Sequence, residues 1–267
     1  MNKITDLIDY NDDRHEYTRA DNGKLLAGVS TVCGILDKPY LKPWAVKLCA
    51  EYAIANYEVG MNKTAFSAMM TEAKKQHTIR LKEAGQTGKD MHAVLEEHVL
   101  ARIAGSTDSL KIENKLQLFA YNQFLNWERD NKVKWYASEM LIGDLDENYA
   151  GTLDDVADVN GIFTLIDFKT SSHISEEYHL QTAGYVAGLR WMAKQGMIKK
   201  VPAARLIIRL PKTLTKEVYD RKTKKYHTRP NELEIYPVLT DLEFDIECFL
   251  ACRKVFKWRN QGLLKKE

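Results

Sequence analysis

An Asn-Gly pair at positions 160 and 161 constrains the fold of this chain more than any other short segment. It separates two runs of strand-forming residues, Val156–Val159 and Ile162–Leu165. Asn-Gly between such runs is the strongest short-range signal of a β-hairpin with a two-residue type I′ turn. In that turn Val159 faces Ile162, and each step away from the turn pairs the next residue of either strand. The sequence therefore predicts the register of the whole hairpin.

This register brings three charged residues together. It places Asp154 opposite Asp167, and Lys169 lies two residues further along on the same face because strand side chains alternate. Directly opposed residues have Cβ atoms about 4.5–5.5 Å apart, a distance at which two carboxylates repel or share a cation. A bound divalent cation, protonation of one carboxyl or good solvation would each relieve the repulsion. Hard oxygen ligands favour Mg²⁺ or Mn²⁺.

Lys169 has two readings in this setting. Its ammonium can position an attacking water and stabilise charge that develops on a phosphate, or it can simply form a salt bridge. The neighbouring Asp155 is the weaker candidate for a ligand, because the register puts it on the opposite face with Ile166 and Phe168, near a strand end. A β-bulge between residues 154 and 159 would reverse that assignment.

The rest of the sequence predicts a mixed α/β core, residues 133–267, behind a mainly helical N-terminal region, residues 1–132. No Pro/Gly/Ser-rich linker separates the two regions, so we expect one integrated domain. Hydrophobic periodicity indicates the individual elements. Residues 1–32 are expected to form short strands and turns; helices are expected at 44–57, 63–82, 88–103, 113–131, 175–194 and 241–260, and strands at 134–142, 149–159, 161–169, 203–210 and 233–238.

Three motifs together resemble the PD-(D/E)XK nuclease superfamily: Gly151-x-x-Asp154, Asp167-x-Lys169 and Gln181-x-x-x-Tyr185. The Gln-x-x-x-Tyr element is typical of its RecB-like branch, and Gly88-Lys-Asp-Met-His92 looks like the histidine motif of that branch. Segments 29–32 and 38–44 are similar to the N-terminal region of the mitochondrial genome maintenance exonucleases and their phage relatives. The chain departs from the family name at Leu153, which stands in place of the proline.

The resemblance implies a restriction-endonuclease-like mixed central sheet flanked by helices. It also implies that His92, Asp154, Asp167 and the backbone carbonyl of Phe168 bind the metal, with Lys169 catalytic. Without the resemblance, His92 would be typical of a solvated helix surface, and the stripe of Tyr178, Gln181 and Tyr185 typical of helix packing. Four residues are expected to orient Lys169 or contact DNA, namely Gln181, Tyr185, Thr170 and Ser171. Glu139 on the preceding strand either lines the site or is an exposed strand-end carboxylate.

Charge and aromatic residues indicate where DNA could bind. The net charge is only +2, but residues 209–229 hold eight basic residues against two acidic ones, in a segment that either grips a phosphate backbone or forms a solvated hairpin. The helical region offers a second set, which would build a stacking and phosphate-binding passage or belong partly to the core. This set comprises Tyr40, Trp44, Tyr52, Tyr57, Lys74, Lys75 and Arg80.

The cysteines and the first residues of the chain bear on two questions, whether an iron–sulfur cluster is present and where in the cell the protein is located. None of Cys33, Cys49, Cys248 and Cys252 forms a Cys-x-x-Cys pair, so we expect structural thiols rather than an iron–sulfur cluster. The first residues lack the patterns of a signal or transit peptide, and no apolar stretch is long enough to span a membrane. A cytoplasmic location is expected, which is the host cytoplasm if the chain is phage-encoded.

The sequence thus predicts a metal-dependent DNA exonuclease that prefers single-stranded ends. The alternatives are a double-strand-resecting recombination exonuclease and a DNA-binding module that keeps the fold without turnover. DNA is the expected partner, with recombination or replication proteins as further candidates and no membrane.

Overall fold

A computed structural model describes residues 3–261 of the chain. The fold divides into two compact units, and the smaller one is Leu36–Asp90. It contains α2 (Leu41–Asn56) and the first part of α3 (Lys63–Ile103), whereas the rest of α3 belongs to the larger unit. The boundary expected between residues 132 and 133 falls inside the larger unit.

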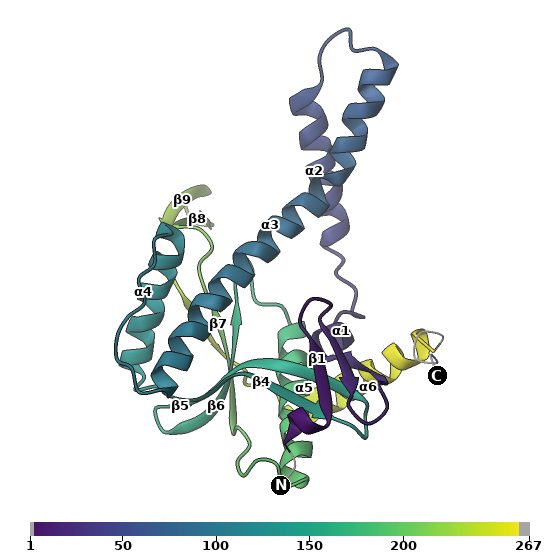
Figure 1. The fold of residues 1–267 in the computed structure, drawn as a ribbon. Coiled ribbons are helices and arrows are strands. Elements are labelled where there is room, and N and C mark those ends of the chain that lie inside the picture. The colour runs from purple at the N-terminus through teal and green to yellow at the C-terminus, as the bar shows by residue number, and fades with distance from the viewer. Residues whose placement is uncertain (1–2, 262–267) are drawn as a thin grey trace. The chain divides into compact units, whose positions relative to one another are not determined.

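The larger unit is built on a mixed sheet (Figure 1). Among the described residues this sheet has eight strands in the order β1-β2-β3-β5-β6-β7-β10, with β4 paired to β5. β3 runs parallel to β5 and β6 runs parallel to β7, while the other neighbours are antiparallel. The strands are β1 (Ile8–Asn11), β2 (Glu16–Arg19), β3 (Leu25–Gly28), β4 (Lys134–Asp144), β5 (Tyr149–Val159), β6 (Ile162–Lys169), β7 (Ala204–Arg209) and β10 (Glu234–Pro237).

The predicted hairpin is confirmed. Asn160 and Gly161 have φ angles of 51° and 85°, the left-handed values that a type I′ turn requires at both central positions. β5 and β6 pair from Val159–Ile162 at the turn to Asp155–Ile166, in the predicted register. The mixed α/β architecture with helices against the sheet is confirmed with it.

One helix prediction was wrong. The helices expected at 63–82 and 88–103 form a single 41-residue helix, α3. Gly85 lies between the two expected helices, but a glycine inside a helix costs only about 1 kcal/mol and leaves the backbone hydrogen bonds intact. Most of the basic segment 209–229 lies in a separate hairpin of β8 (Thr215–Asp220) and β9 (Lys225–Pro230), whose second strand is exposed throughout, whereas Arg209 is buried at the end of β7.

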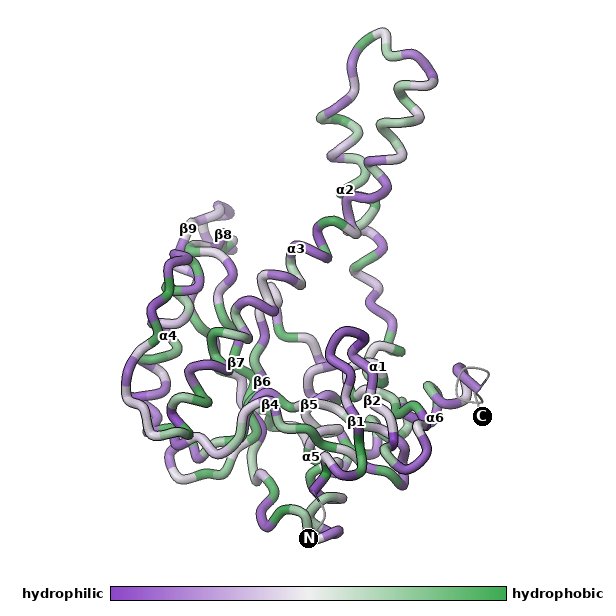
Figure 2. Tube along the Cα trace, viewed as in Figure 1, coloured by the Kyte–Doolittle hydropathy of each residue, from purple (hydrophilic) through white to green (hydrophobic). Residues whose placement is uncertain are grey.

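Helices cover both faces of the sheet. Val156 and Ala157 are consecutive in β5 and belong to different hydrophobic clusters, so the clusters lie on opposite faces. The first cluster includes residues of α1 (Val29–Cys33), α5 (Glu177–Lys194) and α6 (Leu242–Arg259). The second includes α4 (Lys115–Asp130) and α3 from Met91 onward. Figure 2 shows hydrophobic (green) and hydrophilic (purple) residues interspersed along the larger unit. No helix within residues 3–261 is long and apolar enough to cross a membrane.

Two glycines let α5 pack closely. A Cβ on Gly184 would lie 2.7 Å from the ring of Phe249 on α6, and one on Gly188 would lie 2.8 Å from Ile142 of β4. The hydroxyl of Tyr149 donates to the Gly184 carbonyl at 3.1 Å and ties the same turn of α5 to β5. These contacts place α5 directly over the middle of the sheet.

A network of buried polar groups connects the helices on the other face, α3 and α4, to the sheet. His98 of α3 hydrogen-bonds through Nδ1 to the Tyr121 hydroxyl at 2.7 Å and through Nε2 to Glu128 Oε1 at 2.9 Å. Trp135 of β4 donates to the same carboxylate oxygen at 2.7 Å. Burial opposes ionisation of Glu128, but its bonds with His98 and Trp135 prevail and hold its pKa below the usual value. The network therefore joins α3, α4 and β4 around one carboxylate.

Replacing this carboxylate should destabilise the fold. For Glu128→Gln we expect the free energy of unfolding to fall by about 1–3 kcal/mol, because His98 and Trp135 would then bond a neutral amide instead of a charged carboxylate. The lowered pKa means that the stabilisation is present above the unfolded glutamate pKa of about 4.3 and is lost as the pH falls below it. Urea unfolding at pH 7 and pH 4, with the exposed Glu97→Gln as control, measures this. Equal midpoints for the two variants at pH 7 would refute the role of the network.

Candidate metal centre

The candidate site lies where β5 and β6 separate. β4 occupies one edge of β5 along nearly its whole length, whereas the other edge pairs with β3 at Tyr149 and Ala150 and with β6 from Asp155 onward. Residues 151–154 have no strand partner on that edge within the described chain. Here Asp154 Oδ2 accepts a hydrogen bond from the backbone N–H of Phe168 at 2.6 Å. A carboxylate thus bridges the two strands where the backbone ladder ends.

Asp167 occupies the position that the register assigns opposite Asp154. Its side chain is completely buried, and Lys169 Nζ lies 2.5 Å from its Oδ2. Burial raises the pKa of Asp167 to about 6, against the attraction of Lys169 and with the repulsion of Asp154. Its second oxygen, Oδ1, is buried without a hydrogen-bond partner among the described residues. That oxygen is available to a cation or a water.

Lys169 keeps its charge inside the protein. Burial would lower its pKa, but the attraction of Asp167 and Asp154 prevails and raises it. The ammonium lies 5.0 Å from the centre of the Tyr178 ring, within the range of a cation–π contact. Tyr178 was expected only as part of a helix stripe, and this contact depends on how α5 crosses the sheet.

Glu139 faces Asp154 from the third strand. The β4–β5 ladder passes from Ser138–Asp155 to Met140–Leu153, which leaves Glu139 opposite Asp154. Its φ of 46° is left-handed, a conformation that costs a non-glycine residue roughly 1 kcal/mol and is frequent at functional sites. Partial burial of its carboxyl, reinforced by the negative charges of Asp154 and Glu96, raises the pKa of Glu139 to about 7.

His92 completes a set of candidate ligands. Its Nδ1 lies 3.8 Å from Asp154 Oδ2, and its ring meets Phe168 edge-on with centroids 6.4 Å apart. One ligand atom from each of His92, Glu139 and Asp154 lies within 4.8 Å of the others. Two carboxylates and an imidazole suit Mn²⁺ and, with added water ligands, Mg²⁺. Asp167 adjoins this set: its Oδ2 pairs with Lys169, while its Oδ1 has no hydrogen-bond partner among the described residues.

The Gln-x-x-x-Tyr residues pack behind the site. Gln181 Nε2 donates to the Tyr185 hydroxyl at 2.9 Å, and Tyr185 is buried. Tyr185 lies against Gly151, where a Cβ would come within 3.0 Å of its Cε1. The described residues show no hydrogen bond from either side chain to Lys169. The glycine of the Gly-x-x-Asp motif therefore has a packing role next to Asp154.

Two further predicted residues lie in the loop after β6, and the predicted aromatic residues lie in the smaller unit. Thr170 and Ser171 follow β6 directly, and the Ser171 hydroxyl donates to the His173 carbonyl at 2.6 Å within the loop. In the smaller unit Tyr40 and Tyr57 are exposed, while Trp44 and Tyr52 are half-buried. None of these four aromatic residues is fully buried.

Asp155 needed one correction. It pairs with Ile166 as predicted, but it lies in the interior of β5 rather than near a strand end, because β4 and β6 flank it on both sides. It is 2% exposed. Burial, with the nearby charge of Asp154, raises its pKa well above the ordinary value, which favours a neutral carboxyl.

The cysteines lie apart from the predicted metal ligands in the sequence. Cys33 of α1 is buried, and Cys248 and Cys252 of α6 are half-buried. Burial, with the neighbouring Cys252, raises the pKa of Cys33 to about 12. A neutral thiol in this position acts as a small apolar group.

Comparison with known proteins gives no assignment: no protein-family model matches the chain, and no curated protein matches it significantly.

Adding a methyl group beside the site tests its packing. For Gly151→Ala we expect a loss of about 1–3 kcal/mol in the free energy of unfolding, because the new Cβ meets Tyr185 and Val29 in a closely packed region. Gly85→Ala is the control: its Cβ meets open space in a helix, so it should not destabilise. Chemical unfolding of both variants measures this, and Gly151→Ala as stable as wild type would contradict the packing role.

Proposed function

We propose that this chain is a divalent-metal-dependent deoxyribonuclease, an exonuclease that hydrolyses phosphodiester bonds and prefers single-stranded DNA ends. The observation that carries the proposal is the convergence of His92, Glu139 and Asp154 beside the Asp167–Lys169 ion pair. Carboxylates, an imidazole and a lysine in one place are a set suited to phosphoryl transfer. The mixed sheet with helices on both faces supports placing the chain in the PD-(D/E)XK superfamily.

The residues would divide the chemistry as follows. His92, Glu139 and Asp154 would hold the cation, and the buried Oδ1 of Asp167 is a fourth possible donor. When bound, a divalent cation supplies Lewis-acid stabilisation of the phosphate and lowers the pKa of a coordinated water. The charged Lys169 lies beside this centre and can stabilise negative charge that develops on the phosphate.

The chain's own contacts keep Lys169 ready for this role. Asp167 fixes its Nζ, and the Tyr178 ring covers the ammonium from α5. The fixed charge needs no reorganisation when the phosphate becomes more negative, which is the condition for electrostatic catalysis. Gln181 and Tyr185 support the wall of the site rather than the ammonium itself.

Single-strand preference has two supports. One is the resemblance of residues 29–32 and 38–44 to the mitochondrial genome maintenance exonucleases. The other is the smaller unit itself, whose exposed Tyr40 and Tyr57 and basic Lys74, Lys75 and Arg80 combine stacking surfaces with positive charge. Proteins that bind single strands use both groups.

Cleavage of end-labelled single- and double-stranded DNA tests the proposal. With Mg²⁺ or Mn²⁺ the wild type should cleave, and a chelator should abolish cleavage. Asp154→Asn, Asp167→Asn and Lys169→Ala should each lose roughly 100-fold or more in rate. Asp158→Asn is the matched control, since its carboxylate lies on the same strand but bonds Tyr136 outside the site.

The outcomes separate the alternatives. Metal-independent cleavage, or site variants as active as Asp158→Asn, would overturn the nuclease proposal. DNA binding without cleavage would identify a non-catalytic module. Blocking the 5′ or 3′ ends of each substrate distinguishes the single-strand exonuclease from a double-strand-resecting recombination exonuclease, and the same substrates serve to test recombination or replication proteins as partners.

A further inference from the structure

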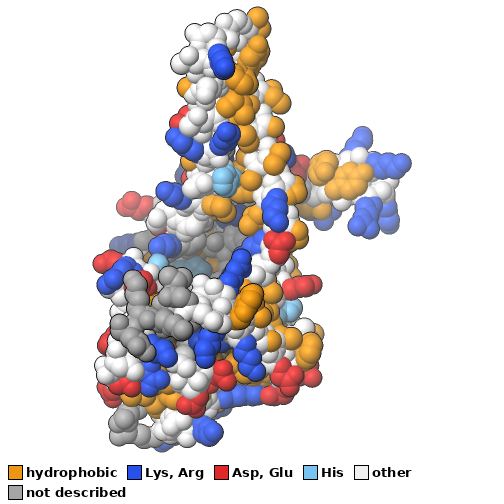
Figure 3. Space-filling view, turned by 90° about the vertical axis from the view of Figure 1, so that its right-hand side faces the viewer, with side chains coloured by type: hydrophobic (Ala, Val, Ile, Leu, Met, Phe, Trp, Pro, Cys, Tyr) orange, Lys and Arg blue, Asp and Glu red, His pale blue; other side chains and the backbone are white. Residues whose placement is uncertain are grey.

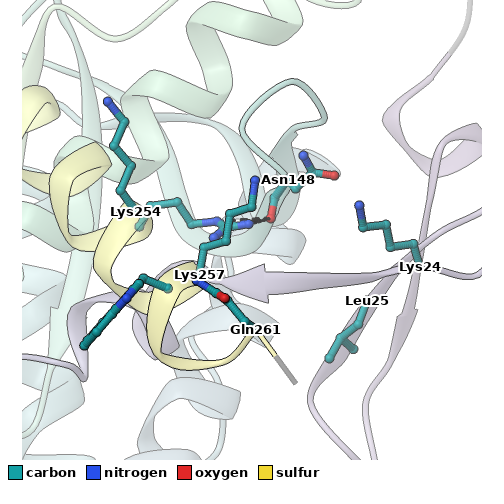
Figure 4. A pocket seen from close by; sticks show the side chains of 8 residues that line it. Lys24, Leu25, Asn148, Lys254, Lys257 and Gln261 are labelled. Carbon is teal, nitrogen blue, oxygen red and sulfur yellow. Dashed lines mark hydrogen bonds between the residues drawn. The ribbon is translucent and has the colours of Figure 1, made fainter. Parts of the chain in front are cut away.

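A basic pocket lies in the larger unit at the C-terminal half of α6. It has a volume of about 370 Å³ and is bordered by the β2–β3 turn, the β4–β5 turn and the last turns of α6. Figure 4 shows Lys24 and Lys257 approaching from different elements on either side of Asn148. Its lining contains four basic residues and no acidic residue: Lys24, Leu25, Asn148, Arg253, Lys254, Lys257, Trp258 and Gln261.

The deepest of these residues, Arg253, has an unused donor. Its side chain is buried, and Nε and Nη2 donate to the Asn148 carbonyl at 3.3 and 2.9 Å. Nη1 is buried without a hydrogen-bond partner in the described part of the chain. Burial lowers the pKa of Arg253, with Glu147 nearby opposing that shift, yet a guanidinium stays protonated. A buried charged donor without an acceptor is unfavourable. The basic side chains that line the pocket therefore lack a negative partner within its lining.

The lysines alone have a simpler explanation. Basic residues in the last turns of a helix interact favourably with its negative end, which accounts for Lys257 and for Arg259 outside the pocket. That interaction does not explain the unused Nη1 of Arg253 or Lys24, which comes from the distant β2–β3 turn. Figure 3 shows Lys and Arg side chains gathered on the face where the described part of α6 ends. An anion in the pocket would lie among Lys24, Lys254 and Lys257 and would supply a counter-charge beside the buried guanidinium of Arg253.

We propose that this pocket binds the phosphoryl group of a nucleotide, with Lys254 and Lys257 as donors, the buried guanidinium of Arg253 as a nearby positive charge, and the Trp258 indole stacking on the adjacent base. Trp258 is 70% exposed, and an exposed aromatic ring beside basic groups is how single-strand binders hold a base and its phosphate. The choice of a nucleotide over another anion rests on the proposed nuclease function.

The pocket is a second site, distinct from the candidate metal centre. Asn148, at its rim, and Asp154 are six residues apart along an extended segment, which corresponds to roughly 20 Å at about 3.3 Å per residue. None of the four basic lining residues takes part in the metal centre. A phosphate bound here would therefore be a remote unit of a DNA strand or a free nucleotide, and the experiment separates these two sources.

Binding measured in a chelator tests the pocket without catalysis. The probes are a labelled oligothymidylate by fluorescence anisotropy, and thymidine 5′-monophosphate, thymidine and inorganic phosphate by competition. We expect the oligothymidylate to bind and the monophosphate to compete better than thymidine. Lys254→Ala/Lys257→Ala should weaken binding at least tenfold and reduce the salt slope by about 1.4, as expected for two lost single-strand phosphate contacts. Arg259→Ala, one charge removed from the same helix, should change binding less than threefold.

Two further variants test the buried guanidinium of Arg253 and the stacking of a base on Trp258. Trp258→Ala should weaken the oligothymidylate and monophosphate but not inorganic phosphate, and Arg253→Gln should weaken all three. Should Arg253→Gln fail to fold by circular dichroism, the exposed Lys254, Lys257 and Trp258 variants decide the question. Competition by the monophosphate as strong as by the oligothymidylate assigns the pocket to a free nucleotide, and a much stronger oligothymidylate assigns it to a strand.

The result that overturns the proposal is a lysine double variant that binds every probe as Arg259→Ala does. Failure of the nuclease proposal looks different, because wild-type protein would then bind DNA in chelator and show no metal-dependent cleavage. If the wild type cleaves DNA and the pocket variants bind the probes as the wild type does, the nucleotide-binding role of the pocket is refuted and the nuclease proposal stands.

Discussion

The candidate site depends on one constraint, the end of the β5–β6 ladder at Asp154. One pair beyond Asp155–Ile166, the Asp154 carboxylate accepts the Phe168 N–H, and the strands diverge around it. Glu139 of β4, which is exposed, and Asp167 of β6, which is buried, flank Asp154, so negative charge accumulates at this point of the sheet. Such a concentration is unfavourable unless cations offset it. Lys169 provides one positive charge, and a metal ion would provide more.

Helices on both faces of the sheet contribute residues to the candidate site. On one face the His98 network holds the part of α3 that carries His92, so the imidazole comes from an element that is itself anchored by buried hydrogen bonds. On the other face α5 brings Tyr178 over Lys169 and Tyr185 against Gly151. Residues that are far apart in the sequence thereby lie close together where β5 and β6 separate, and the sheet between the two helical layers holds their relative positions.

Local chemistry explains what the sequence could predict. The Asn160-Gly161 turn and the alternation of strand residues determine the facing of Asp154, Asp167 and Lys169, because both depend only on neighbours in the chain. Glu139 could not be assigned, since its left-handed φ inside a strand has no turn signature in the sequence. The pocket at Arg253 is formed by turns and a helix that lie more than 100 residues apart, and local sequence patterns do not predict contacts between such distant segments.

Manganese binding tests the central claim most directly, because it asks for the metal centre without requiring a substrate. Electron paramagnetic resonance of Mn²⁺ titrated into the protein should show a bound ion in the wild type and in Asp158→Asn. Binding should weaken at least tenfold in Asp154→Asn, and it should also weaken in His92→Ala and Glu139→Gln, since each removes one ligand. Equal Mn²⁺ affinity in the wild type and all three ligand variants would contradict the proposed centre.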